Sequence, residues 1–392
     1  MAHIAFFAPN GHGHVNPLLG LATELVRRGH RITFAAPEAF ADPITETGAE
    51  HVPTPTTWKG QGESPQMHGA ELIRAMGSLL TEIKVVHADQ IDRQAPDLVV
   101  HDATLAWWGR LLAHRWGVPA VENWPNLVSN KYWALHHDHT RINPLNPRFL
   151  LTVFRMIRYA RSQGYTDGGA FMTGTNAALR LVTLPKAFQY EGESFADTHL
   201  FVGPTLTDRS FQREWTPPTE DPVLLVSLGT AYNERPELYR EIARAAQGRP
   251  WHVVMSIGAS DPDALGDLPP NVEVHAQVPQ LSILRHATVF VTHAGMGGTM
   301  EGLVNEVPLV ALPQMAEQRA NADRIRQLGL GRALNPDTVD GDSLWKAVEE
   351  VAHDPNVRER LRWMRDRIDE AGGVGTAADA VEGLLGEGAT RT

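Results

Sequence analysis

The chain has 392 residues, no cysteine and a formal net charge of −11. This length exceeds the size at which one hydrophobic core stops growing, so we expect two domains. The lack of cysteine excludes disulfides, thiolate nucleophiles and thiolate metal sites. The negative charge disfavours nucleic acid as a partner, because that binding needs lysine and arginine to neutralise phosphates.

Composition places the chain among ordinary globular proteins, with 42% hydrophobic and 21% charged residues. The first apolar run, at residues 3–8, is interrupted by Pro9 and lacks the basic start of a signal peptide. No window approaches the ~18 apolar residues that span a bilayer. We therefore expect a cytoplasmic protein with no membrane partner.

The first half of the chain alternates strand-like and helix-like patterns. Apolar residues 4–8 lead through the turn NGHGH into a leucine-rich helical pattern that ends before Gly29, and residues 31–36 predict the next strand. Further strands are predicted at 97–101 and 118–122, on either side of a helix at 105–116. This alternation is typical of a parallel sheet covered by helices on both faces.

A segment rich in proline and charge, REWTPPTEDP at residues 213–222, interrupts this alternation. The alternation of strand-like and helix-like patterns then resumes, with strands predicted at 223–227, 252–257, 272–275, 289–292 and 309–312. We predict an α/β protein of two facing, Rossmann-like, doubly wound domains with a cleft between them, at residues 1–212 and 222–373, joined by a linker at 213–221. Ligands of such sheets bind beyond the carboxyl ends of the strands, so polar motifs there carry most weight.

The densest pattern lies at residues 289–322. A buried-type strand delivers His293 at its carboxyl end, and the glycines that follow, among them Gly295 and Gly298, allow a close turn into a helix beginning near Thr299. Unpaired amides at Gly298 and Thr299, the helix dipole and a hydrogen bond from His293 would suit a diphosphate. A tight strand-to-helix turn without a ligand explains the glycines equally well.

Acidic and amide side chains follow the same strand ends. Glu301 is an acceptor suited to ribose hydroxyls, although its spacing argues against an ordinary NAD site. Glu317 and Gln318 follow Pro313 and the next predicted strand, where they could receive sugar hydroxyls. The alternative for this pair is a solvated helix cap.

Residues 278–318 resemble the donor-binding signature of nucleotide-sugar glycosyltransferases of the GT-B fold. The matching features are VPQ at 278–280, THAG at 292–295, Glu301, VPLVALPQ at 307–314 and the EQ pair at 317–318. Through HGHVNP, LVVHD, RWGVPAV and VSLGT, essentially the whole chain resembles bacterial macrolide glycosyltransferases of the oleandomycin-inactivating kind. The similarity is weakest at residues 53–95 and 131–175.

The resemblance implies a complete donor site. The residues it assigns are Ser227 and Thr230 beside the diphosphate, His293, Gly295, Gly298 and Thr299 at the phosphates, Glu301 at the ribose, Val278 and Gln280 at the base and ribose, and Glu317 and Gln318 at the sugar. Family members often have a tryptophan that stacks on the base where this chain has Gln277. The choice between a uridine and a thymidine nucleotide therefore stays open.

The resemblance also places a catalytic base at His14, at the start of the first predicted helix. A neutral imidazole would take the proton of an acceptor hydroxyl as its oxygen attacks the anomeric carbon, a role worth ~10² to 10⁴ in rate. Asp102, which ends LVVHD, is implied to orient the imidazole and balance its charge. Taken alone, His14 is also explained as a polar helix cap.

Three polar groups resemble metal sites. His12 and His14 form an HxH pair without an acidic third ligand at a recognisable spacing, so we expect His12 to shape the loop or line the acceptor site. HHDH at residues 136–139 and the DxD of Asp261 and Asp263 are expected on exposed loops. We therefore predict no metal.

The aromatic stretch at residues 124–135 could line a wide apolar acceptor pocket, with Trp124, Asn126 and Trp133 as candidates beside His12. Ordinary core packing is the alternative. A helix at 374–388 is expected to pack back onto the first domain, and a linker near Pro217 and Pro218 would permit hinge motion.

These patterns predict an inverting, metal-independent glycosyltransferase, monomeric or homodimeric, with no tightly bound cofactor. It would move a hexose, most simply glucose from UDP-glucose, to a hydroxyl of a bulky apolar natural product such as a macrolide or other polyketide antibiotic, and so inactivate it. The alternatives are a biosynthetic transferase using a dTDP-deoxysugar, a nucleotide-sugar epimerase, and a catalytically silent binding or helper protein of the same fold.

Overall fold

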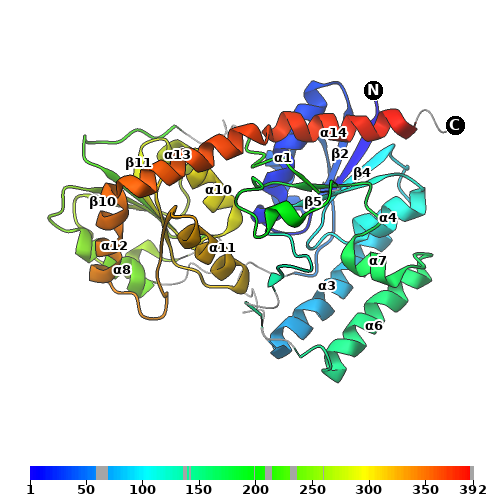
Figure 1. Ribbon diagram of the computed structural model, residues 1–392, viewed down its shortest axis with the longest axis horizontal. Helices are drawn as coiled ribbons and strands as arrows, with labels where there is room; N and C mark the ends of the chain where they lie inside the picture. Colours follow the sequence, from blue (N-terminus) through cyan, green and yellow to red (C-terminus); the bar gives the residue numbers. More distant parts are fainter. Residues whose placement is uncertain are drawn as a thin grey trace. The chain divides into compact units, whose positions relative to one another are not determined.

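The computed structural model describes residues 1–58, 69–135, 139–140, 143–197, 199–207, 214–229, 236–258 and 260–388. The chain divides into two compact units, each a sheet covered by helices (Figure 1). The first unit contains the described residues up to Thr207 together with those from Ile368 onward, and the second contains those from 214 to Arg367. No helix in the described ranges combines the length and apolar character that a membrane crossing requires.

The first unit is built on a seven-stranded parallel sheet in the order β3-β2-β1-β4-β5-β6-β7. The strands are β1 His3–Phe7, β2 Arg31–Ala36, β3 Glu50–Pro53, β4 Leu98–Asp102, β5 Ala120–Trp124, β6 Leu179–Val182 and β7 His199–Phe201. Strand order reverses between β1 and β4, which pair from Ile4 opposite Leu98 to Phe7 opposite His101. Such a reversal is where open α/β sheets bind their ligands.

Helices cover both faces of this sheet because side chains alternate along each strand. Ile4 and Phe6 of β1 pack with α1 and α14, whereas Ala5 and Phe7 pack with α3, α4, α6 and α7. The helices are α1 His12–Arg27, α2 Ala41–Glu46, α3 Gly69–Gln90, α4 Trp108–Trp116, α6 Pro147–Ser162, α7 Gly168–Thr173 and α14 Gly373–Gly388. Arg28, the C-cap of α1, donates to the carboxylates of Asp379 and Glu382, 2.6 Å away in each case, and so holds α14 beside α1 (Figure 1).

The second unit has a six-stranded parallel sheet in the order β10-β9-β8-β11-β12-β13. Its strands are β8 Val223–Ser227, β9 His252–Ser256, β10 Val272–His275, β11 Ala287–Thr292, β12 Leu309–Ala311 and β13 Gly331–Ala333. Its helices are α8 Pro236–Ala246, α9 Gln280–Leu284, α10 Met296–Val304, α11 Ala316–Gln327, α12 Gly341–His353 and α13 Pro355–Glu370, the last of which runs into the first unit. Strand order reverses between β8 and β11, where Ser227 lies opposite Thr292.

The prediction of two doubly wound parallel sheets is confirmed. The strands at 31–36, 223–227 and 272–275 have the predicted bounds, and the other predicted strands are displaced by one to two residues at either end. The helix expected from residue 105 begins at Trp108, because the Asp102 side chain accepts from the amides of Thr104 and Leu105 and holds a turn there. The short strands β3, β6, β7 and β13 carry too weak an apolar alternation to be predicted.

Candidate active site

The carboxyl ends of β1 and β4 bring together the predicted base and its partner. His14 follows β1 at the start of α1, Asp102 ends β4, and His14 Nδ1 lies 2.9 Å from Asp102 Oδ2. The Asp102 side chain is fully buried, whereas the His14 side chain retains 21% of its exposure. With Nδ1 donating to the carboxylate, the lone pair of the imidazole lies on Nε2 and can accept a proton.

The second carboxylate oxygen of Asp102 is also hydrogen-bonded. Its Oδ1 accepts from the amides of Thr104 and Leu105 and from the Thr104 hydroxyl, which also lies 3.1 Å from His14 Nδ1. Burial raises the pKa of Asp102, but the charge of His14 and these hydrogen bonds outweigh burial and leave the pKa below its usual value. The carboxylate is therefore ionised at neutral pH. Thr104 was not among the predicted site residues, and its only signal in the sequence is that of a turn-forming threonine two residues after Asp102.

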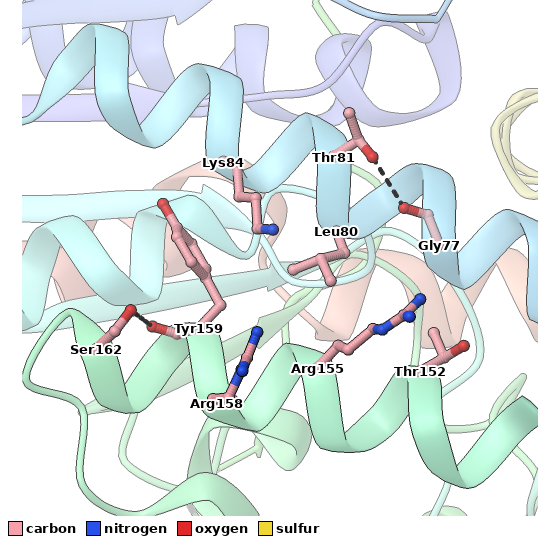
Figure 2. A pocket seen from close by; sticks show the side chains of 9 residues that line it. All are labelled: Gly77, Leu80, Thr81, Lys84, Thr152, Arg155, Arg158, Tyr159 and Ser162. Carbon is pink, nitrogen blue, oxygen red and sulfur yellow. Dashed lines mark hydrogen bonds between the residues drawn. The ribbon is translucent and has the colours of Figure 1, made fainter.

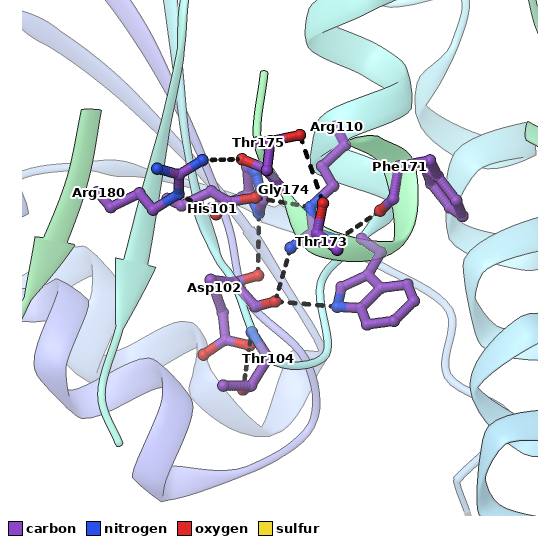
Figure 3. A network of polar contacts seen from close by, with 12 residues as sticks. His101, Asp102, Thr104, Arg110, Phe171, Thr173, Gly174, Thr175 and Arg180 are labelled. Carbon is purple, nitrogen blue, oxygen red and sulfur yellow. Dashed lines mark hydrogen bonds and ion pairs between the residues drawn. The ribbon is translucent and has the colours of Figure 1, made fainter. Parts of the chain in front are cut away.

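A buried ionic network supports the turn that carries Asp102. Figure 3 shows Arg110 and Arg180 approaching from opposite sides, with Gly174 between them and Asp102 nearby. Arg110 Nε donates to Glu122 Oε1 at 2.7 Å, and Arg110 Nη2 donates to the carbonyl of Ala103, the residue after Asp102. Arg180 lies 3.6 Å from the same carboxylate. Glu122 therefore balances two buried guanidinium groups next to the turn that follows Asp102.

Glu122→Gln should lower the free energy of unfolding by about 3 to 5 kcal/mol, because it leaves buried arginines without a carboxylate. The matched control is Glu50→Gln, which breaks the exposed pair of Glu50 with Arg31 and should cost below about 1 kcal/mol. Urea unfolding of both variants measures the difference. Equal stability of the two would show that the network contributes nothing beyond an exposed pair.

The predicted donor residues gather at the corresponding place in the second unit, where β8 and β11 end. His293 directly follows β11, Ser227 ends β8 with its side chain buried, and Gly295 forms the N-cap of α10. A Cβ at Gly295 would lie 2.4 Å from the His293 ring, and one at Gly229 would lie 2.6 Å from it. Glycine at both positions leaves room for the ring, so Gly229 joins the predicted residues as part of this site.

One detail of the predicted phosphate cradle is wrong. The helix begins at Met296 rather than near Thr299, and the Thr299 amide donates to the Gly295 carbonyl at 2.9 Å. The amides without an intrahelical partner are those of the first helical residues, Met296, Gly297 and Gly298. Thr299 instead offers its hydroxyl, whose oxygen is buried with no hydrogen-bond partner in the described part of the chain.

The residues predicted to contact the nucleobase and the ribose lie in or next to α10. Glu301, buried within α10, accepts a 2.6 Å hydrogen bond from Gln280 Nε2 at the start of α9. Val278 lies half-buried just before α9, and Gln277 is exposed. The structure thus brings together the two side chains that the sequence assigned to the ribose.

The EQ pair opens α11. Gln318 is buried, and its Oε1 accepts from the amides of Gln314 and Met315 at 2.8 and 3.2 Å. Gln318 therefore caps the helix, although as a buried side chain rather than the solvated cap that sequence suggested. A contact between Gln318 and a sugar would use its nitrogen, and the half-buried Glu317 lies beside it.

The remaining candidates are placed as follows. Thr230 and the first three residues of HHDH lie outside the described residues. Asp261 accepts from the amide of Asp263 at the start of a short 3₁₀ helix, Pro262–Leu265, and both aspartates are exposed. Within the described ranges, no three His, Asp or Glu residues cluster closely enough to hold a metal ion.

The acceptor candidates lie in different surroundings. The exposed His12 ring packs edge-on against Phe40, and Trp133 is buried and stacked on Tyr190 with 4.7 Å between ring centroids. Trp124 donates from Nε1 to Glu122 and so belongs to the buried network. Asn126 is half-buried.

Burial lowers the pKa of His293 to about 4, opposed in part by the Ser227 backbone. An unfolded histidine titrates near 6.5, so between these values the unfolded chain binds more protons than the folded one. Stability should therefore rise with pH across this window and fall on acidification. We expect His293→Gln to show a shallower pH slope in thermal unfolding than the wild type, and the exposed His353→Gln to keep it. Identical slopes for wild type and His293→Gln would contradict this assignment.

Comparison with known proteins fits this geometry. Residues 205–367 match the family described as UDP-glucoronosyl and UDP-glucosyl transferase. The oleandomycin glycosyltransferase of Streptomyces antibioticus is 39% identical, over 98% of this chain and 91% of its own length. The demethyllactenocin mycarosyltransferase of Streptomyces fradiae is 37% identical, over 98% of this chain and 87% of its own. The chain belongs to this family of glycosyltransferases.

The fold agrees with that assignment. The crystal structure of the calicheamicin glycosyltransferase CalG4 is similar to that of the present chain, with a TM-score of 0.85 and 37% identity over 99% of each chain. The glycosyltransferase thus has the GT-B fold, as the resemblance predicted. Its cosubstrate is a nucleotide sugar, as in its family.

Proposed function

We propose that the enzyme is an inverting, metal-independent glycosyltransferase that moves a hexose to a hydroxyl of a bulky apolar natural product. The observation that carries this proposal is the His14 and Asp102 pair, which joins a partly exposed imidazole to a fully buried carboxylate. A catalytically silent helper of the same fold would have no need of it. We assign the acceptor to the amino-terminal domain at residues 1–212 and the donor to the domain at 222–373.

In the proposed reaction, His14 Nε2 takes the proton of the acceptor hydroxyl as its oxygen attacks the anomeric carbon of the sugar. The bond from that carbon to the diphosphate oxygen breaks on the opposite face, and the configuration inverts. Asp102 balances the charge that develops on the imidazole. The first amides of α10, the helix dipole and a hydrogen bond from neutral His293 stabilise the leaving diphosphate without a metal.

We infer that the donor is UDP-glucose. The family description names UDP-glucosyl transfer, and Glu301 with its partner Gln280 offers an acceptor for ribose hydroxyls. A specific observation favours the alternative of a dTDP-deoxysugar, since one relative is named as a mycarosyltransferase. Gln277 is exposed at the position where family members often stack a tryptophan on the base, so discrimination between uracil and thymine does not come from that stacking.

The proposed acceptor is a macrolide or another polyketide antibiotic, in line with the relative named as an oleandomycin glycosyltransferase. A sugar on an essential hydroxyl would block the drug's contacts with its target, so the transfer would inactivate it. A biosynthetic role would produce the same chemistry on an intermediate rather than on the finished drug.

The experiment incubates the purified enzyme with UDP-glucose or dTDP-glucose, a panel of macrolides and phenols, and a chelator, and follows product mass and anomeric configuration. We expect a mass increase of one hexose, an inverted anomer and full activity in the chelator. A retained anomer would contradict the single displacement, and loss of activity in the chelator would contradict metal independence. Donor consumption without an acceptor adduct would favour an epimerase.

A further inference from the structure

The outer face of α6 carries an unusual set of exposed apolar side chains. Among the described residues, the exposed large hydrophobic side chains other than Met1 all lie between residues 132 and 154. Three of them are on α6, where Leu150 retains 50% of its exposure, Leu151 46% and Phe154 58%. Isolated exposed hydrophobic residues are common, but a cluster marks an interaction surface.

These side chains are not the core-facing side of α6. The helix packs inward through Thr152, Met156 and Ala160, which are buried and spaced four residues apart. Helical periodicity places Leu150, Leu151 and Phe154 on the opposite face. Packing against the described core of the first unit therefore does not require them to be apolar.

The same helix is strongly basic in a chain whose net charge is −11. Its sequence, PRFLLTVFRMIRYARS, holds four arginines and no acidic residue. A groove of about 590 Å³ runs between α3 and α6, and Figure 2 shows Lys84, Arg155 and Arg158 projecting into it beside Tyr159. None of these three cations forms an ion pair with a described carboxylate. Like charges gathered in one groove attract an anion.

We propose that this α6 surface, formed by Leu150, Leu151, Phe154, Arg155, Arg158 and Lys84, binds the surface of an anionic lipid bilayer. Lipid phosphates would occupy the groove, and the three apolar side chains would enter the boundary between headgroups and acyl chains. We expected no membrane partner because no segment is long and apolar enough to span a bilayer, but peripheral binding needs no such segment.

The arrangement of charge and apolar groups on α6 fits a bilayer surface. Helices that lie on membranes combine arginine or lysine with phenylalanine and leucine, so that the charges meet the headgroups while the apolar side chains insert. On α6 the arginines lie beside the apolar side chains, since Arg158 is four residues from Phe154 and Arg155 four from Leu151. Long basic side chains on such a helix can reach headgroup phosphates while the apolar ones insert.

The binding should be reversible and sensitive to salt. Each lysine or arginine near an anionic surface strengthens partitioning by about fivefold, and this contribution is screened as ionic strength rises. The proposal concerns a surface on the first unit and does not depend on which donor or acceptor the enzyme uses.

The test is flotation of the full-length enzyme with vesicles of phosphatidylcholine alone or mixed with phosphatidylglycerol. We expect binding to the mixed vesicles, at least about tenfold weaker binding to phosphatidylcholine, and release at about 0.5 M salt. Arg155→Glu with Arg158→Glu should abolish it, and Leu151→Ser with Phe154→Ser should weaken it about tenfold or more. The matched control is Arg244→Glu with Arg326→Glu, which places the same charge change on exposed arginines of the second unit.

Thermal unfolding and turnover of a water-soluble acceptor show whether each variant remains folded. Equal binding to both kinds of vesicle, or unchanged binding by the Arg155 and Arg158 variant, would overturn the proposal. Binding of inorganic phosphate that is lost in the Arg155 and Arg158 variant, in an enzyme that does not bind vesicles, would also overturn it. That result would indicate a site for a small anion. Stoichiometric co-purification of an acidic protein in the absence of vesicle binding would assign the surface to a protein partner instead.

Discussion

Replacing His14 by alanine is expected to lower kcat by about 10² to 10⁴, because the acceptor hydroxyl then attacks without a positioned base. The donor KM should change little, since His14 lies in the first unit and the donor residues lie in the second. Initial rates at varied donor concentration and saturating acceptor measure both constants. The matched control is His12→Ala, which removes an exposed imidazole two residues away that packs on Phe40. Wild-type turnover by His14→Ala would exclude His14 as the base.

Asp102→Asn tests whether the Asp102 charge sets the basicity of His14. The amide keeps the shape of the side chain but removes the charge that favours the imidazolium, so the rate at neutral pH should fall. The acid limb of the kcat/KM profile should also move to lower pH, because protonation of His14 becomes less favourable. A rate loss without this movement would indicate that Asp102 only supports the fold of the turn.

The second large effect is expected at the donor site. His293→Ala should weaken UDP binding by about 10- to 100-fold, because it removes a hydrogen bond to a charged diphosphate. Since its pKa is about 4, His293 is neutral at physiological pH and the affinity it provides should be constant between about pH 5 and 8. Titration calorimetry with UDP measures both effects.

Gly295→Ala sharpens that test because it leaves the imidazole in the chain. Its new Cβ would lie 2.4 Å from His293 Nε2, so the ring must move. We expect a loss of UDP affinity similar to that of His293→Ala, whereas His353→Ala, at an exposed histidine of the same unit, should bind as the wild type does. Wild-type affinity in both site variants would remove His293 from the phosphate site.

Local sequence determined much of the fold and of the donor site. Strand alternation, helical periodicity and glycine-rich turns are read over ten or so residues, and they predicted both sheets. His293, Gly295 and Gly298 fall on one strand-turn-helix unit, so their neighbourhood in space follows from their neighbourhood in sequence. The error at Thr299 was also local, because the helix starts three residues earlier than its apolar pattern suggests.

Only the tertiary structure decided the contacts between distant segments. His14 and Asp102 are 88 residues apart, and they meet because β1 pairs directly with β4, a register that no local pattern encodes. In the second unit, the pairing of β8 with β11 likewise brings Gly229 against the His293 ring. Sequence could name the types of residue that this chemistry needs, but the order of strands in the sheets determined which of them touch.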